Sequence, residues 1–296
     1  MIAFLFPGQG SHYSGMGENF AKYESAEKFY QRASEVLGFD IYEVMNGDEE
    51  FLTLTENAQP AIYLASYIAF EEIKKMGIEP EVVAGHSLGE YTALAAAGVY
   101  DFETGIYLVR KRGEYISQAL EPGKGTMAAI IGLDLEKIEE IVNSIEGVYI
   151  ANYNAPVQIV ISGLKNAVYE AMEKCKEAGA RKVVELKVSG PFHTPYLKYA
   201  EEKMEEEVRQ IKFRKPCCPI VMNVTAKPTT DPEEIKKNLI AQITGPVKWV
   251  QTMKTMKEMN VTEMYEIGPK DVLKGLGKRN KVKVKHFSEV VVMESA

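Results

Sequence analysis

A serine lies between two glycines in the segment GHSLG at 85–89. The residues before it, 81–84, predict a short strand, and the alanine-rich run after it predicts a helix. A Gly-x-Ser-x-Gly turn between a strand and a helix is typical of a nucleophile elbow, in which the hydroxyl of Ser87 is lifted off the sheet edge. The following helix directs free N–H groups and its dipole at this point, where they favour negative charge. A glycine-rich turn with a capping serine is the alternative, and the placement between strand and helix favours the nucleophile.

A serine nucleophile needs a general base, and the chain contains four histidines. His86 adjoins Ser87, so its side chain should leave the turn in another direction and be structural. His286 lies in a basic stretch and is expected at the surface, whereas His12 follows the first predicted strand and could line a pocket. His193 comes after the serine in the chain, as the base does in α/β-hydrolases. Position and elimination therefore favour His193, and an ordinary histidine would make activity rise with pH near about 6.5.

An oxyanion hole requires two N–H donors. Leu88 follows the nucleophile and is expected to supply the first donor. The second should come from a loop after another strand, and the loop 7–10 follows the strand predicted over 2–6. Gln9 is the candidate in that loop, although a simple glycine turn fits its sequence as well.

Arg112 differs from its basic neighbours in its position on the helix predicted over 101–120. Helical spacing places it beside the apolar stripe, on a flank with Leu108, so we expect it to be partly buried. Arg110 falls on a glutamate-rich flank that should be solvated, and Lys111 points away from the stripe. A buried guanidinium needs an anion, which could be an internal carboxylate or a substrate carboxylate bound through the two-pronged guanidinium fork.

Strands and helices alternate along the chain, which predicts an α/β protein. Strands are expected at 2–6, 81–84, 127–133, 148–152, 158–162, 182–188, 220–224 and 264–267. Helices besides those already named are expected at 18–37, 60–76, 135–145, 167–178, 195–209, 232–243 and 247–259. The order β-α-β-β-α-β between flanking glycines is that of a ferredoxin-like unit. We therefore expect an inserted subdomain over 125–189 and a larger core formed by 1–124 and 190–296.

Composition restricts the classes of protein that fit. The chain has 296 residues, of which 46% are hydrophobic and 26% charged, as in a globular protein with one large core and a smaller unit. The net charge of −7 argues against a nucleic-acid binder. Three cysteines without a CxxC pair and few histidines predict no metal site. The absence of a long apolar run or leader predicts a cytoplasmic protein with no membrane partner.

The chain resembles malonyl-CoA–acyl carrier protein transacylases and the related acyltransferase domains of fatty-acid and polyketide synthases. The matching segments follow one another along nearly the whole chain: FPGQGSH at 6–12, NAQPAIYLAS at 57–66, GHSLGEYTAL at 85–94, Arg112-Gly113, NYNAPVQIVISG at 152–163, GPFH at 190–193, Asn223-Val224, Gln242 with GPVKW at 245–249, and EIGPKDVLKGL at 266–276. FPGQG together with GHSLGE is far more specific than Gly-x-Ser-x-Gly alone.

The resemblance implies an α/β-hydrolase-like core with a parallel sheet and a ferredoxin-like insert. It also implies the roles of the reacting groups: Ser87 is acylated, His193 is the catalytic base, and Gln9 and Leu88 form the oxyanion hole. Arg112 matches the arginine that binds the malonyl carboxylate.

The resemblance assigns supporting roles to further residues. A main-chain carbonyl near Gln242 would orient the histidine, so no triad acid is expected. Three side chains match pocket positions, namely Gln59, Asn154 and Asn223. Arg181 and Lys182 match a basic segment near the phosphates of coenzyme A, and they and the basic stretch 278–285 are candidates for contact with an acidic carrier protein.

The function implied by the resemblance is cofactor-free, ping-pong transfer of malonyl from malonyl-CoA to the phosphopantetheine thiol of acyl carrier protein, in fatty acid biosynthesis. A serine hydrolase such as a thioesterase is the alternative, against which Arg112 and the missing acid argue. A non-catalytic acyl-binding module is a third hypothesis. His12 stands where the family often has glutamine, and the residues before His193 vary among members, so the finer acyl specificity stays open. A monomer is compatible with the sequence, which does not determine the oligomeric state.

Overall fold

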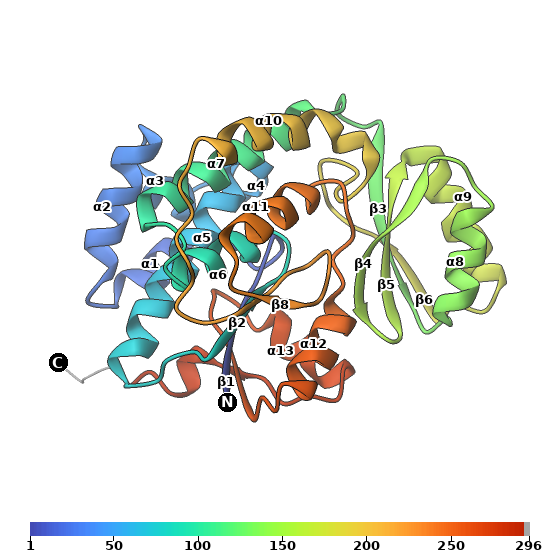
Figure 1. The fold of residues 1–296 in the computed structure, drawn as a ribbon. Helices are drawn as coiled ribbons and strands as arrows, with labels where there is room; N and C mark the ends of the chain where they lie inside the picture. Colours follow the sequence, from blue (N-terminus) through green and yellow to red (C-terminus); the bar gives the residue numbers. More distant parts are fainter. Residues whose placement is uncertain (293–296) are drawn as a thin grey trace.

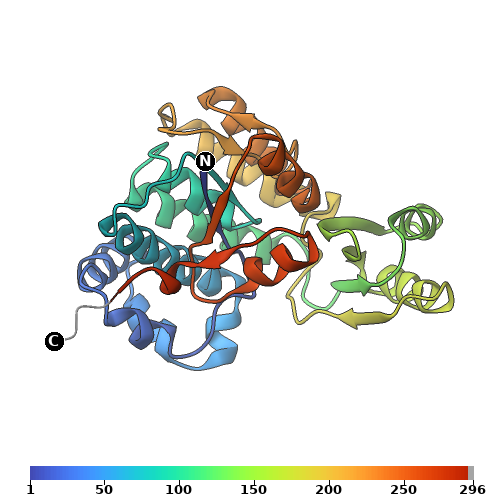
Figure 2. The ribbon, with the colours of Figure 1, turned by 90° about the horizontal axis from the view of Figure 1, so that it is seen from below.

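The structure is a computed structural model that describes residues 1–292 and contains two β-sheets (Figure 1). The smaller sheet and its two helices stand beside the larger unit, as the view from below in Figure 2 also shows. The chain enters the smaller sheet after α7 (Phe102–Gln118) and leaves it before α10 (Lys198–Arg209). The smaller unit is therefore inserted within the larger one, and the exact division at 125 and 189 stays a proposal.

The larger sheet is mostly parallel and has hydrophobic strands at its centre. In spatial order it consists of β10 (Lys285–His286), β9 (Glu263–Glu266), β1 (Ile2–Phe6), β2 (Val82–Gly85), β7 (Ile220–Val221) and β8 (Pro228–Thr229). All neighbouring pairs are parallel except β7 with β8. Strands β1 and β2 are almost wholly apolar because helices cover both faces of the sheet. The α/β class with a parallel sheet, predicted from the sequence, is confirmed.

Side chains of β1 alternate between two separate hydrophobic cores. Phe4 and Phe6 belong to the larger core, whereas Ala3 and Leu5 belong to the core on the opposite face. The larger core packs against α7, α10, α1 (Met16–Ala21), α2 (Ala26–Leu37), α3 (Ile41–Asn46), α4 (Glu49–Thr53), α5 (Thr55–Lys75), α6 (Gly89–Ala96) and α11 (Pro232–Ala241). The opposite core packs against α12 (Trp249–Glu258) and α13 (Val272–Arg279).

The smaller sheet is antiparallel and is covered by helices on one face only. Its spatial order is β4 (Val148–Ala155), β5 (Gln158–Leu164), β3 (Gly125–Ile131) and β6 (Lys182–Glu185), which is the ferredoxin-like order predicted from the sequence. Helices α8 (Leu135–Asn143) and α9 (Lys165–Glu177) pack on one face. The other face carries Met127, Ala129 and Val160 and is packed by Phe192 from the larger unit. Main-chain bonds between β4 and Val247 also join the two units.

Several predicted elements differ from the observed ones. The single helix predicted over 18–37 is two helices, α1 and α2, because a turn at Tyr23 packs that ring against Phe20 and Phe287. The strand predicted over 182–188 ends at Glu185, and the chain beyond it leaves the sheet. Short helices α3, α4 and α13 were not predicted, since each is under three turns long and offers few periodic repeats.

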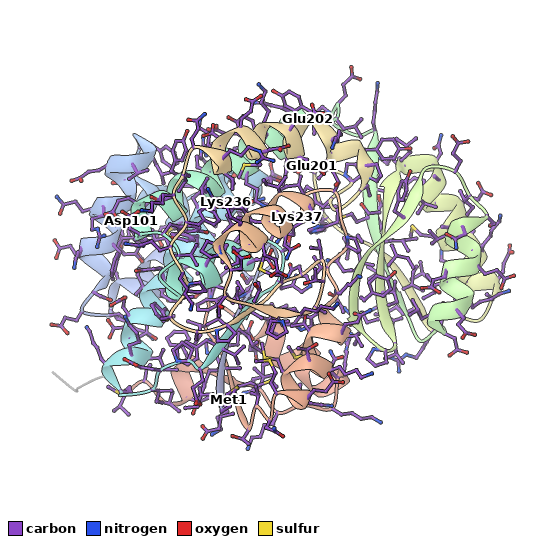
Figure 3. The ribbon with its side chains drawn as sticks, in the orientation of Figure 1. Met1, Asp101, Glu201, Glu202, Lys236 and Lys237 are labelled. Atoms are coloured by element: carbon purple, nitrogen blue, oxygen red, sulfur yellow. The ribbon has the colours of Figure 1, made fainter. Side chains whose placement is uncertain are left out.

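Charged side chains surround the larger unit. Glu201 and Glu202 lie on α10, and Lys236 and Lys237 lie on α11 (Figure 3). Asp101 caps α7 by accepting a hydrogen bond of 2.8 Å from the N–H of Thr104.

Within residues 1–292, no helix combines the length and the apolar composition that crossing a membrane requires.

Glycines allow the turn after β2 to lie directly against the end of β1. A Cβ placed on Gly89 would lie 2.0 Å from the carbonyl oxygen of Phe6, and one on Gly85 would lie 2.0 Å from the backbone of Gly89. Both distances are far below any possible contact, so neither position can carry a side chain without moving the backbone.

We expect Gly89→Ala to lower the free energy of unfolding by at least about 1–3 kcal/mol, the usual range for overpacking, because the clash is with backbone atoms. The matched control is Gly275→Ala, which is also in a helix but has no atom within 4 Å of the added carbon. That change should be neutral or stabilise by about 0.5–1 kcal/mol, since alanine favours the helix. Urea denaturation of both variants measures the difference, and equal stabilities would contradict the close packing at Gly89.

Candidate active site

Ser87 occupies a strained turn between β2 and α6. Its φ of 54° lies in the left-handed region, which a non-glycine residue adopts only when its surroundings enforce it. Asn223 provides that support from beneath: its Oδ1 accepts the Ser87 N–H at 2.9 Å, and its Nδ2 donates to the Gly85 carbonyl at 2.6 Å. The geometry of the nucleophile elbow predicted from the sequence is present.

His193 contacts the serine hydroxyl directly. Its Nε2 lies 2.8 Å from Ser87 Oγ, and its Nδ1 lies 3.0 Å from the carbonyl oxygens of both Gln242 and Gly245. Because carbonyl oxygens only accept, Nδ1 must carry the proton, and Nε2 is left as the acceptor for the serine proton. Within residues 1–292, no carboxylate bonds to this histidine, so main-chain oxygens stand where a triad acid would be.

The pKa of His193 is lowered to about 3, first by burial and then by the positive charge of Arg112. Burial penalises the charged imidazolium, and a neighbouring cation penalises it further. The neutral form that can accept a proton therefore persists well below pH 6.5. An ordinary histidine would make activity rise as the pH passes through about 6.5. That expectation conflicts with the lowered pKa of His193.

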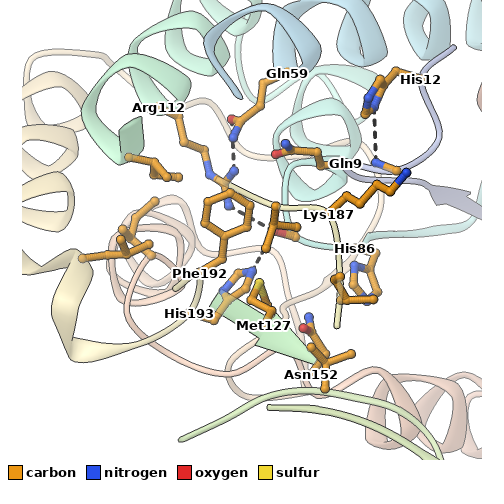
Figure 4. Close-up of a pocket in the computed structure, with 18 of the residues that line it drawn as sticks. Gln9, His12, Gln59, His86, Arg112, Met127, Asn152, Lys187, Phe192 and His193 are labelled. Carbon is orange, nitrogen blue, oxygen red and sulfur yellow. Dashed lines mark hydrogen bonds between the residues drawn. The ribbon is translucent and has the colours of Figure 1, made fainter. Parts of the chain in front are cut away.

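Arg112 reaches the same hydroxyl from α7 (Figure 4). Its Nη2 donates to Ser87 Oγ at 3.1 Å and to Gln242 Oε1 at 3.0 Å, and its Nη1 donates to Gln59 Oε1 at 3.0 Å. The side chain is 3% exposed, and its guanidinium lies 5.4 Å from the centre of the Tyr91 ring. All of these acceptors are neutral, and no carboxylate of residues 1–292 forms a hydrogen bond with the buried charge.

Gln242 joins the three groups. Its carbonyl oxygen accepts from His193, its side-chain oxygen accepts from Arg112, and its Nε2 donates to the Ser87 carbonyl at 2.8 Å. The sequence analysis assigned it only the main-chain contact. Glu90 was missed: its carboxyl accepts the Asn223 N–H at 2.7 Å and faces Gln242 Nε2 at 3.3 Å. Burial raises the pKa of Glu90 to about 8, so its carboxyl is largely uncharged at neutral pH.

These groups open onto a cavity of about 330 Å³ between the two units. Polar lining residues come from both units, with Gln9, His12 and Gln59 in the larger unit and Asn152, Asn154 and Lys187 in the smaller one. The apolar lining residues lie on the uncovered face of the smaller sheet, in the segment after β6 and near the ends of helices, and are Ile116, Met127, Val160, Leu186, Val188, Phe192, Leu197 and Ile243. The inserted unit therefore forms one side of the cavity.

Most residues predicted for the pocket lie around it. Gln9, Gln59 and Asn154 line the cavity. His86 lines it as well, and its Nε2 lies 2.7 Å from Asn154 Oδ1, so its role as a structural residue stays a prediction. Asn223 is an exception, because it lies under the turn and does not form part of the wall. The sequence pattern located Asn223 near the site but could not distinguish the two positions.

Arg181 and Lys182 do not reach the cavity. Both side chains are exposed. Lys182 pairs with Ile131 at the C-terminal end of β3, whereas Met127, which lines the cavity, lies near the other end of that strand. Lys182 precedes Leu186 by four residues, which is about 13 Å along an extended chain. Besides Arg112, the cavity is lined by Lys187, which the sequence analysis missed because it was placed inside a predicted strand.

Two predictions of exposure were wrong. Arg110 donates to the Glu56 carbonyl at 2.6 Å and to Asn57 Oδ1 at 2.9 Å, because the start of α5 packs across α7 at this point. His286 is half-buried and its Nε2 lies 2.8 Å from the Gly268 carbonyl. In both cases a segment distant in sequence covers a side chain that the local pattern predicted to be solvent-exposed.

The α/β fold and the serine–histidine pocket are those of the acyltransferase class, and the family model described as "Acyl transferase domain" matches residues 3–292. The chain belongs to this family. Within it, the chain is 43% identical to the malonyl CoA-acyl carrier protein transacylase of Bacillus subtilis, over 94% of this chain and 90% of that protein.

Solved structures agree with this relationship. An acyl carrier protein S-malonyltransferase from Vibrio cholerae superposes with a TM-score of 0.92 at 39% identity, covering 96% of both chains. A malonyl-transacylase solved in complex with its type II PKS acyl-carrier protein gives a TM-score of 0.93 at 39% identity, covering 96% of this chain and 94% of that one.

The lowered pKa of His193 can be measured directly. We expect its imidazole to stay neutral, protonated on Nδ1, from pH 8 to pH 5, because burial and Arg112 both oppose the charged form. Nitrogen-15 NMR of the histidine rings follows this titration. Arg112→Ala should move the pKa upward, since the second cause of the shift is removed. A wild-type midpoint near 6.5 would contradict the electrostatic description.

Proposed function

We propose that the protein transfers a malonyl group from malonyl-CoA to the phosphopantetheine thiol of acyl carrier protein through a malonyl ester of Ser87. One observation carries the proposal: the serine hydroxyl lies within hydrogen-bond distance of both a neutral histidine and an uncompensated arginine. The histidine suits attack on a thioester, and the arginine suits an acyl group that carries its own carboxylate. The matches to malonyl-transferring relatives support the same assignment.

In the first half-reaction Ser87 Oγ attacks the thioester carbonyl while His193 Nε2 takes its proton. The new C–O bond forms a tetrahedral intermediate, which collapses with cleavage of the C–S bond. The departing thiolate of coenzyme A receives the proton from His193. The carbonyl oxygens of Gln242 and Gly245 hold the ring in the required tautomer and stabilise the transient imidazolium.

The oxyanion of that intermediate is assigned to the N–H groups of Gln9 and Leu88. Leu88 begins the turn into α6, and the loop that contains Gln9 packs on the elbow closely enough that a Cβ on Gly8 would lie 3.6 Å from Leu88 N. Within residues 1–292, neither N–H donates a hydrogen bond, so both are available. Preorganised donors of this kind are usually the largest electrostatic contribution to acyl transfer.

In the second half-reaction the carrier thiol attacks the carbonyl of the malonyl-serine while His193 takes the thiol proton. The new C–S bond forms, the ester C–O bond breaks, and His193 returns the proton to the Ser87 oxygen. The thioester is already an activated acyl group, so the proposed chemistry requires no cofactor or metal. The carrier's acidic surface would meet basic residues on this chain, with Arg181, Lys182 and the 278–285 stretch as candidates outside the cavity. We place the reaction in the cytoplasm, where fatty acid biosynthesis would supply both substrates.

Intact mass spectrometry tests the acyl-enzyme. Malonyl-CoA alone should add one malonyl group, located on Ser87, and Ser87→Ala should abolish the adduct. His193→Ala should slow its formation by about 10²–10⁴-fold, the usual effect of losing a general base. His86→Ala is the matched control and should retain most of the rate if folded. An adduct on Cys217 or Cys218 instead would rule out the serine mechanism.

Arg112→Ala tests the recognition of the malonyl carboxylate. Removing one partner of a buried charge pair costs about 2–5 kcal/mol, so the preference for malonyl-CoA over acetyl-CoA should fall by roughly 30-fold to several thousand-fold. The measurement is the ratio of the two kcat/KM values. Because Arg110 is held by α5, the better control is Lys111→Ala, since the side chain of Lys111 is 32% exposed and forms an ion pair with Glu114 away from the cavity. An equal loss for both substrates in Arg112→Ala would make the arginine structural.

A further inference from the structure

Arg112 is held by two amide side chains. Its Nη1 donates to Gln59 Oε1 and its Nη2 to Gln242 Oε1, each at 3.0 Å, and both glutamines are at most 1% exposed. We infer that Gln59 and Gln242 permit selection of the acyl group by satisfying hydrogen bonds of the guanidinium without neutralising its charge, so that the acyl group must supply the counter-ion. This inference rests on the proposed malonyl transfer and assigns the two amides a function within it.

The neutrality of these acceptors is the decisive property. Glutamate has nearly the same shape as glutamine and is the ordinary partner of a buried arginine, because it compensates the charge that burial leaves unsolvated. An amide oxygen satisfies the hydrogen bond but leaves the net charge in place. A substrate carboxylate therefore gains the full attraction of Arg112, whereas an uncharged acyl group leaves the cation buried and unpaired.

The amide orientations are fixed by the surroundings. A guanidinium has only donors, so each glutamine must present its oxygen to Arg112. The Nε2 of Gln242 is directed at acceptors, with the Ser87 carbonyl at 2.8 Å and Asn223 Oδ1 at 3.3 Å. A glutamate at 242 would place an oxygen against these oxygens. Gln59 has no such restriction, since it lines the cavity and, within residues 1–292, its Nε2 donates no hydrogen bond.

The ionisable groups nearest Arg112 do not replace the missing counter-ion. The carboxyl of Glu90 is turned toward the Asn223 N–H and the amide of Gln242, and it makes no hydrogen bond to the guanidinium. Tyr91 presents its ring to the guanidinium and is uncharged at neutral pH, because burial raises its pKa well above the ordinary value. Position 59 is therefore where a single substitution can introduce a compensating charge.

The test substitutes this position and compares acyl groups. Gln59→Glu should lower the ratio of kcat/KM for malonyl-CoA to kcat/KM for acetyl-CoA by at least about tenfold, because the new carboxylate neutralises Arg112 and repels malonyl. Gln59→Met is the matched control: it removes the acceptor but adds no charge, so the ratio should stay within about threefold of wild type even if both rates fall. Gln59→Asp places the same charge one methylene further away and carries the test if the glutamate variant does not fold.

The outcomes separate the inference from the function on which it rests. A wild-type enzyme that forms no malonyl-serine would remove the proposed function itself. A malonyl-selective wild type with an unchanged ratio in folded Gln59→Glu or Gln59→Asp would overturn the inference alone. An equal fall of the ratio in Gln59→Met would also overturn it, because the amide would then act by positioning Arg112 and not by its neutrality.

Discussion

The close contact between the turn after β2 and the end of β1 is the constraint on which the active site depends. No side-chain carbon fits at Gly85 or Gly89, and one on Gly8 would lie 2.5 Å from the His86 carbonyl. Because the backbones touch, the loop that contains Gln9 and the elbow that contains Ser87 form one rigid surface. This contact on one side and the hydrogen bond to Asn223 beneath the turn stabilise the strained, left-handed backbone conformation of Ser87.

Upon that surface the chain assembles a polar network whose members depend on one another. Gln242 connects Ser87, His193 and Arg112, so the position of each group is set partly by the others. In a low-dielectric site, leaving any polar group of such a network without a partner costs free energy. The network therefore favours one arrangement of its side chains and makes that arrangement rigid. Burial and, after it, the guanidinium of Arg112 lower the pKa of the nearby His193, so the charge proposed to bind the acyl carboxylate also affects the state of the base.

The inserted unit contributes one side of the cavity. Helices α8 and α9 cover one face of its sheet, and the other face would be exposed in isolation. Packing of Met127 and Val160 toward Phe192 and the segment after β6 covers that face and places an apolar wall opposite the serine. Polar and apolar residues of both units therefore line the cavity. The proposed acyl site thus lies at the boundary between the two units.

The sequence alone determined the elbow, the division into a larger unit and a ferredoxin-like insert, and the burial of Arg112. Each of these follows from local periodicity or from glycines that a tight turn requires. Spacing along one helix was enough to separate Arg112 from Lys111, since both lie on the same rigid cylinder. Tertiary structure alone decided what covers each side chain. Arg110 is held by α5, Asn223 lies under the turn, and Glu90 and Lys187 join the site from positions with no periodic signal. Contacts between residues more than fifty positions apart depend on how helices and strands pack, which no local pattern encodes.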